Sequence, residues 1–483
     1  MQAQTQEKTQ QEERQYRTFP ILLSFLIAGF IGLFSETALN IALNDLIQIF
    51  AIQPSTIQWL TTGYLLTLGI LVPVSGLLLQ WFTTRQLFIT SLIFSIIGTL
   101  IAALAPSFEI LLVARVIQAI GTALLLPLMF NTILLIFPIH KRGSIMGLIG
   151  LVIMFAPAIG PTISGLVIAN LSWHWIFWLA LPFFALSLIC GIMFMENVST
   201  ITKPKIDIVS IILSTFGFGG VVYGFSVSGE GEGWGSSKVI IALLVGIIAL
   251  ILFTIRQLSM QQPMMNLRAF KFPMFTLGVI LLFIGMMTIL SSMIMLPLYL
   301  QGGLALSAFA AGLVLLPGGI LNGFMSPVMG RLFDKYGPRW LVIPGMVIVT
   351  IVLWLFSSVS MDTAITFVVA LHIFLMIGVS MIMMPAQTNG LNQLPPQFYP
   401  DGTAIMNTLQ QVAGAIGTAV AITIMSAGQK SYMSNVTNPN DPLNAVNSLN
   451  AGIQNAFVFA LIVSVIGLIC ALFIKRVNVE QKN

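Results

Sequence analysis

The sequence has few charged residues and few of the side chains that metal centres and intramembrane enzymes need. Only 7% of its 483 residues are charged, against roughly a quarter in a soluble globular protein. It has 3 histidines, and its 2 cysteines, Cys190 and Cys470, lie far apart within apolar runs. Such cysteines are typical of small core residues, not of a disulfide or a metal pair. Its glycine-rich turns lack the Lys-Ser/Thr of a phosphate-binding loop. We therefore expect neither an enzyme nor a cofactor.

The sequence consists largely of long apolar runs. Hydrophobic residues make up 57% of the chain, and the mean hydropathy is +0.99. One membrane crossing needs about 20 apolar residues in a helix. The fold class expected is an all-α polytopic membrane protein with fourteen transmembrane helices. We expect these near 20–43, 57–80, 86–105, 109–131, 143–169, 173–195, 206–228, 237–257, 273–300, 306–328, 338–358, 363–388, 402–427 and 453–475.

The basic residues lie mainly on one side of these expected helices. If the polar tail 1–18 is inside, only Lys238 and Lys430 of the 20 basic residues fall in outer segments, and Arg115 falls within a span. The positive-inside rule then places both termini in the cytoplasm. This distribution explains the net charge of +5 without a nucleic-acid partner. The Asn/Ser-rich stretch 428–452 is expected to be a solvated outer loop.

One carboxylate stands inside the first apolar run. Gly29, Gly32, Glu36 and Asn40 are spaced by three and four residues and so share one helix face. A carboxylate in hydrocarbon costs a few kcal/mol, so it usually faces a bundle interior, often at an ion or substrate path. Glu36 lies about 24 Å from the inner start of its helix, and Arg115 about 9 Å from the outer start of the fourth. The two distances add to roughly one helical span, so both charges are expected at a similar depth in the outer third of the membrane. We expect the two groups to interact, directly or through water. The alternative partner of Arg115 is Glu109, on the same helix.

Two motifs connect this chain to a family. The segment Gly330, Arg331, Asp334, Gly337 and Arg339 in the loop between the tenth and eleventh helices resembles the signature Gly-x-Leu-x-Asp-Arg-x-Gly-Arg-Arg of the major facilitator superfamily. A carboxylate at a helix N-terminus with cations nearby would form a latch between helix ends. The alternative is a basic loop that merely obeys the positive-inside rule. The copy in the first half, residues 76–88, is degenerate.

The second motif lies in the fifth helix. Pro157, Gly160, Pro161 and Gly165 are similar to the antiporter signature Gly-Pro-x-x-Gly-Gly. Proline removes a helix hydrogen bond and small residues allow close packing, so this stretch predicts a kinked, tightly packed hinge. Kinked helices of this composition also occur in other membrane proteins. In the family the motif marks exporters.

The chain thus resembles the fourteen-helix drug:proton antiporter branch, most nearly the lincomycin-resistance subgroup of Gram-positive bacteria. The resemblance implies a six-helix bundle at 19–200, an inserted helix pair at 201–262 and a second six-helix bundle at 263–476, followed by a cytoplasmic tail at 477–483. Repeated halves around a central cavity are the usual plan of secondary transporters. In this reading Glu36 and Arg115 couple transport to protons, with the proton motive force as energy source.

Polar side chains within the spans are candidates for the substrate cavity. They are Asn40, Tyr64, Gln118, His372, Asn407, Gln410 and Gln411. Amides suit varied substrates, but they also join helices to one another. His372 lies near the expected bilayer middle and could carry protons, or it could be a satisfied interior histidine.

The function expected is proton-driven export of small amphiphilic compounds by alternating access, from a monomer in a bacterial plasma membrane. The alternative is export of an endogenous metabolite, a lipid-like molecule or a siderophore, with drug export incidental. A sensor should carry a soluble output domain, and the sequence offers none. Glu36 is the one acid expected deep in the membrane, which predicts a low proton stoichiometry.

Overall fold

The computed structural model describes residues 17–228, 233–436 and 441–477, and these residues form helices and connecting turns. Fourteen helices in this described part are long and apolar enough to cross a membrane. The expected number and type of spans are therefore confirmed. Helices are the natural choice because each satisfies its own backbone hydrogen bonds away from water. Residues 1–16 and 478–483, which hold most of the two expected tails, lie outside the described residues.

For description, the helices are grouped along the chain by the expected division, and N half, inserted pair and C half serve here as names only. The N half consists of α2 (Thr18–Phe50), the short α3 (Pro54–Ile57), α4 (Trp59–Trp81), α5 (Thr84–Ala103), α6 (Phe108–Ile136), α7 (Ile139–Asn170) and α8 (His174–Phe194). The inserted pair is α9 (Ile208–Val227) and α10 (Ser237–Ser259). The C half consists of η2 (Leu267–Lys271), α11 (Pro273–Leu298), η3 (Tyr299–Gly303), α12 (Ala308–Tyr336), α13 (Arg339–Phe356), α14 (Ile365–Asn392), η4 (Pro396–Phe398), α15 (Tyr399–Ser434) and α16 (Pro442–Ala471).

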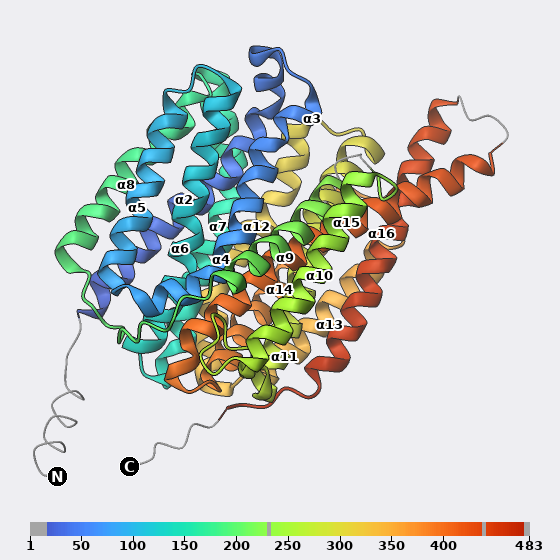
Figure 1. Ribbon diagram of the computed structural model, residues 1–483. Helices are drawn as coiled ribbons and strands as arrows, with labels where there is room; N and C mark the ends of the chain where they lie inside the picture. Colours follow the sequence, from blue (N-terminus) through green and yellow to red (C-terminus); the bar gives the residue numbers. More distant parts are fainter. Residues whose placement is uncertain (1–16, 229–232, 437–440, 478–483) are drawn as a thin grey trace, which may run out of the picture.

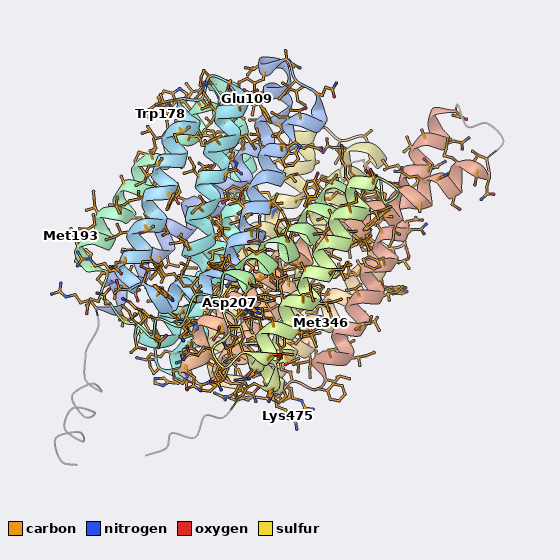
Figure 2. The ribbon with its side chains drawn as sticks, viewed as in Figure 1. Glu109, Trp178, Met193, Asp207, Met346 and Lys475 are labelled. Atoms are coloured by element: carbon orange, nitrogen blue, oxygen red, sulfur yellow. The ribbon has the colours of Figure 1, made fainter. Side chains whose placement is uncertain are left out.

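The helices run between two ends of one bundle (Figure 1). We call the end where α2 begins and α16 finishes the proximal end, and the other the distal end. Figure 2 shows Trp178 and Glu109 toward the distal end and Lys475 at the proximal end. Large apolar side chains are exposed along the sides of the bundle, for example Ile241 at 60% and Ile255 at 58% on α10. A helix with this much exposed apolar surface is suited to a hydrocarbon surrounding.

The inserted pair lies against both halves. On the N half, the α9 residue Val222 packs on Gly69 of α4, and Tyr223 stands 5.9 Å from Trp59 between ring centroids. On the C half, the indole nitrogen of Trp234 donates a hydrogen bond to the hydroxyl of Thr423 on α15, 2.5 Å away. The pair therefore covers the side of the bundle where α4 and α15 meet.

The expected outer loop at 428–452 is largely helical instead. Helix α15 continues to Ser434, and α16 begins at Pro442. The Asp441 carboxylate accepts a hydrogen bond from the Leu443 amide at 2.9 Å and so caps the first turn of α16. Leu449 then packs on Gly302. Capping and packing outweigh the polar composition here, and the distal ends of α15 and α16 project beyond the other helices (Figure 1).

The tenth-to-eleventh loop is also shorter than expected. Helix α12 runs to Tyr336, so Gly330, Arg331 and Asp334 are helical, and the helix ends at Gly337. Gly337 has φ of +81°, a value that favours glycine at a helix end. Asp334 consequently lies near the C-terminal end of α12, and its carboxylate lies near the start of α7.

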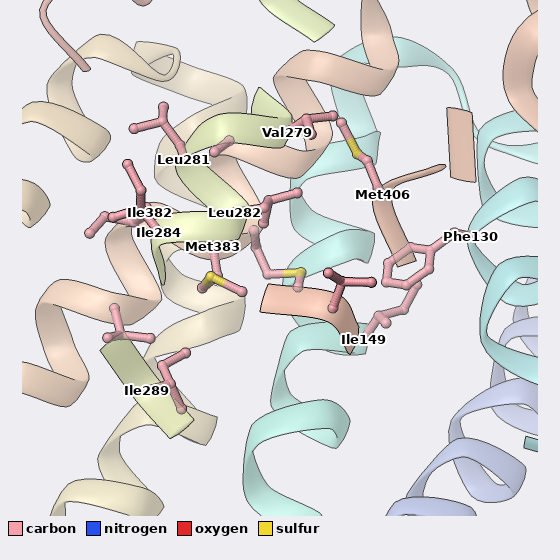
Figure 3. Close-up of a cluster of buried hydrophobic side chains, with 14 of the residues drawn as sticks. Phe130, Ile149, Val279, Leu281, Leu282, Ile284, Ile289, Ile382, Met383 and Met406 are labelled. Carbon is pink, nitrogen blue, oxygen red and sulfur yellow. The ribbon is translucent and has the colours of Figure 1, made fainter. Parts of the chain in front are cut away.

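At the proximal end the two halves meet through an apolar plug. Figure 3 shows Phe130 of α6 and Ile149 of α7 on one side, with Met406 of α15 and Leu282 of α11 on the other. All four belong to one contiguous buried cluster, with exposures of 1% or less. Helices α7 and α12 also pack directly on each other there, at Gly143 against Gly330 and at Gly147 against Ser326, so the two halves are in contact at the proximal end.

An ion pair joins the proximal ends of α9 and α10, and it generates a stability prediction. Arg256 donates to both carboxylate oxygens of Asp207, at 2.6 and 2.9 Å. These hydrogen bonds are the main reason that the pKa of Asp207 falls from 3.8 to about 2. Arg256 is 40% exposed, so solvent screening leaves about 1 kcal/mol of stabilisation.

We expect Asp207→Asn to lower the thermal unfolding midpoint of the detergent-solubilised protein by about 1–2 °C near pH 7. Because the folded pKa is lowered, the contribution is present above about pH 4 and is lost as the pH falls toward 2. The difference between wild type and variant should therefore shrink over that range. Asp362→Asn, at an exposed position, is the matched control. An equal effect of both substitutions, or a difference that does not change with pH, would rule out this role.

Candidate functional site

A buried arginine occupies the distal part of the N half. Arg115 on α6 is 1% exposed and is the largest fully buried side chain in the described part of the chain. Its Nη1 donates to the main-chain oxygen of Ser35 at 3.1 Å, and its Nη2 to that of Glu36 at 3.3 Å. Its Nε reaches the main-chain oxygen of Leu60 on α4 at 3.4 Å. The guanidinium thus joins three helices through backbone carbonyl groups.

Side chains complete the surroundings of Arg115. Its Nη1 also donates to Gln118 Oε1 at 3.0 Å, and Gln118 in turn donates to the Thr99 hydroxyl at 2.9 Å. The ring of Tyr64 lies under the guanidinium, with 4.3 Å from Cζ to the ring centroid. A cation over an aromatic face is attracted most strongly where water is excluded. Tyr64 is held in place by a 2.8 Å hydrogen bond from its hydroxyl to Thr122.

Glu36 lies beside this arginine, but the contact is through its backbone. The structure places the two residues at the same depth, as the helix counts predict. Within the described chain, however, the side chains of Glu36 and Arg115 form no ion pair, and the pair recorded is Arg256–Asp207. The Glu36 side chain is of intermediate exposure, whereas Arg115 is buried. Part of the Glu36 residue is therefore exposed, while the cation beside it is enclosed by protein. The side chain of Asn40 lies outside the described residues.

The other expected cavity residues are divided between α14 and α15. His372 is 7% exposed and packs on Gly318 of α12, and its Nδ1 has no hydrogen-bond partner among the described residues. Asn407 donates to the main-chain oxygen of Thr403 in its own helix at 2.8 Å. Gln410 and Gln411 are of intermediate exposure. The structure does not bring these four residues into contact with the Arg115 network.

The expected hinge in α7 is an unbroken helix from Ile139 to Asn170. Gly160 provides a close approach, because a Cβ there would lie 2.5 Å from the Thr37 hydroxyl oxygen of α2. Gly165, in contrast, has nothing within 4 Å of the place where its Cβ would be. Pro157 is of intermediate exposure, and the side chain of Pro161 lies outside the described residues. Close packing therefore holds at Gly160 and not at Gly165.

Asp334 connects the two halves at the proximal end. Its carboxylate accepts hydrogen bonds from the amide nitrogens of Gly143 and Ser144, at 2.8 and 2.7 Å, and from the Ser144 hydroxyl at 2.5 Å. Both residues lie in the second turn of α7, near the positive end of the helix dipole, which favours an anion. Arg331 and Arg339 are exposed and are not among the recorded hydrogen-bond partners of Asp334. The cations expected around the carboxylate are thus replaced by helix amides.

A second connection between the halves, at Arg142, is not predicted by the sequence. Its Nη1 donates to Asn392 of α14 and to the Tyr399 hydroxyl of α15, both at 3.0 Å. It is 6% exposed and it also binds the main-chain oxygens of Leu134 and Phe137. In the sequence Arg142 follows Lys141, and this basic pair is typical of a cytoplasmic loop under the positive-inside rule. No local signal distinguishes it from such a residue.

Two buried side-chain amides, at Asn131 and Gln387, are likewise not predicted by the sequence. The side-chain nitrogen and oxygen of Asn131 on α6, and those of Gln387 on α14, have no hydrogen-bond partner among the described residues. Both side chains are 1% exposed. A buried polar group without a partner costs about 1–3 kcal/mol.

Comparisons with known proteins agree with this arrangement. A family model described as Major Facilitator Superfamily matches residues 25–418. The chain is 71% identical to lincomycin resistance protein LmrB of Bacillus subtilis (strain 168), over 98% of this chain and 99% of that protein. It is 68% identical to LmrB of Listeria monocytogenes, over 95% and 97%. Multidrug export protein EmrB of Haemophilus influenzae is 26% identical, over 88% and 84%.

Solved structures have the same fold. The human organic anion transporter MFSD10 aligns with a TM-score of 0.66 at 14% identity, over 95% of this chain and 100% of that one. The proton:xylose symporter XylE aligns with a TM-score of 0.64 at 14% identity, over 94% of each chain. From the family match, the relatives and the fold, this chain belongs to the Major Facilitator Superfamily.

Proposed function

We propose that this chain is a proton-coupled multidrug exporter that moves small amphiphilic compounds by alternating access between its N and C halves. The observation that carries the proposal is the position of Glu36, an acid within a membrane span whose main-chain oxygen binds the buried Arg115. The relatives named for lincomycin resistance and multidrug export support the direction and the substrate class. The alternative, export of an endogenous metabolite, a lipid-like molecule or a siderophore, would use the same site with another ligand.

The orientation is part of this proposal. With the basic segments inside, the proximal end faces the cytoplasm of a bacterial cell and both termini lie there. Asp334 and Arg142 then hold the cytoplasmic end shut, and substrate and protons exchange with the outside. We also propose that residues 19–200 and 263–476 form the two six-helix bundles and that residues 201–262 form the inserted pair. We further propose that the monomer is functional. Nucleic acid has no part in this function.

The coupling step follows from charge balance at Glu36. When the Glu36 carboxyl is neutral, Arg115 keeps its backbone carbonyl partners. Arg115 is then the only charged group of this pair that has to be removed from water. When the carboxyl is ionised, the positive charge of Arg115, which binds the main-chain oxygen of Glu36, offsets its charge. Binding of a proton thus changes the net charge next to the buried Arg115, where electrostatic interactions are stronger than in water. Because Glu36 is the one deep acid expected in the spans, we propose a low proton stoichiometry and weak selection for dications.

The first test removes the titratable group. Glu36→Gln keeps the shape of the side chain and cannot release a proton. We expect it to abolish uphill export of lincomycin in proteoliposomes with an imposed pH gradient. Exchange of labelled for unlabelled lincomycin at equal concentrations should continue, since it needs no proton movement.

The matched control for that test is Glu196→Gln, which removes a carboxylate near the end of α8, at the proximal surface. It should retain uphill export. Uphill export that survives in Glu36→Gln would exclude Glu36 as the coupling group. Absence of lincomycin exchange in the wild type, with exchange of another compound, would favour the alternative substrates.

The second test concerns the Asp334 latch. Asp334→Asn removes the charge that accepts three hydrogen bonds from the start of α7. A hydrogen bond to a charged group contributes about 1.5–3 kcal/mol. We expect the equilibrium to shift toward the cytoplasm-open state by about tenfold or more. Double electron–electron resonance between spin labels on α7 and α12 measures this shift, and an unchanged distance distribution would exclude the latch.

A further inference from the structure

The C-terminal segment lies across the proximal ends of two C-half helices. We call Lys475–Val477 the strap. Asn389 on α14 donates from Nδ2 to the Lys475 main-chain oxygen at 3.0 Å. Its Oδ1 accepts from the Val477 amide at 3.2 Å. One buried amide side chain, 1% exposed, thus binds the backbone on both sides of Arg476 and fixes which way that side chain points.

Arg476 is directed to the end of α12. Its Nη2 donates to the main-chain oxygen of Asp334 at 2.8 Å, and its Nη1 to that of Lys335 at 3.4 Å. The last carbonyl groups of a helix lack intrahelical partners and carry partial negative charge, so a cation there is favourable. The aliphatic part of Arg476 packs on Gly337, where an added Cβ would lie 3.0 Å from its Cδ.

Asp334 is therefore held on two sides. The strap binds its main-chain oxygen, while its carboxylate binds the amides of Gly143 and Ser144 in the other half. Asn389, Asp334 and Arg476 all belong to the C half, so the strap can stay attached when the halves separate. Arg476 and Val477 also border a cavity of about 760 Å³ at the junction of the halves, together with Arg142 and Asp334.

We propose that Asn389 and Arg476 are positioning residues for the latch: they fix the end of α12 so that the Asp334 carboxylate meets the start of α7. This inference rests on the proposed function, in which that contact closes the cytoplasmic end. A helix cap without this role would stabilise the C half and leave the opening of the cytoplasmic end unchanged. Loss of a positioning residue should make the contact between α7 and α12 more accessible to a reagent from the cytoplasmic side. Loss of a simple helix cap should not.

The experiment measures that access with one cysteine. Ser326 of α12 is 1% exposed and lies against Gly147 and Gly150 of α7. We place Ser326→Cys in a full-length chain with Cys190→Ser and Cys470→Ser. A charged maleimide is added to inside-out vesicles, and the labelling rate is measured for Arg476→Met, Asn389→Leu and Asp334→Asn. Lys475→Met is the matched control, because it removes a neighbouring exposed charge and keeps the main-chain bonds of the strap.

We expect Arg476→Met to raise the labelling rate about two- to fivefold, as loss of a cation at a helix end implies. Asn389→Leu should act in the same direction, and Asp334→Asn should exceed both. Lys475→Met should label at the reference rate, and Arg476→Lys should restore part of the slow rate. Thermal unfolding midpoints of each variant show whether the fold is retained.

The outcomes separate the strap from the latch. If Asp334→Asn accelerates labelling and neither Arg476→Met nor Asn389→Leu does, the strap has no positioning role and the latch stands. If Asp334→Asn has no effect, the latch itself is wrong and the strap proposal falls with it. Equal acceleration by Lys475→Met and Arg476→Met would also overturn the proposal, because surface charge alone would then explain the effect.

Discussion

The constraint that organises the N half is one guanidinium charge buried within a membrane-spanning bundle. An arginine there is costly unless its donors find partners. Arg115 meets this need with carbonyl oxygens of α2 and α4, with Gln118, and with the face of Tyr64. Because carbonyl groups of two other helices are its acceptors, α2, α4 and α6 are held at one relative depth. Glu36 is left beside a cation whose own bonds do not depend on the carboxylate.

The proximal end is held by contacts of a different kind. An apolar plug, the Asp334 carboxylate on helix amides and the Arg142 hydrogen bonds all cross between the halves. Each can be exchanged for water when the halves separate, whereas the contacts of Arg115 lie within one half. A ligand shifts the equilibrium between a closed and an open state by its difference in affinity for the two.

The fourteen spans and the shared depth of Glu36 and Arg115 could be predicted from the sequence, because long apolar runs and isolated charges are visible along one chain. The partners of Arg115 could not, since every residue has a carbonyl group and packing alone decides which ones face the guanidinium. Arg142 looks like any basic residue beside Lys141. The polar stretch after Gly428 becomes helical because Asp441 caps α16 and Leu449 packs on Gly302, neither of which composition reveals.

The most direct test of the central claim is proton release on substrate binding. Purified protein in lightly buffered detergent solution receives lincomycin while a pH-sensitive dye reports free protons. If Glu36 exchanges its proton for substrate, the wild type releases protons in proportion to bound substrate, and Glu36→Gln binds lincomycin without release. Equal proton release from both proteins would contradict the account. So would lincomycin binding by the wild type without proton release at any pH within about one unit of neutrality.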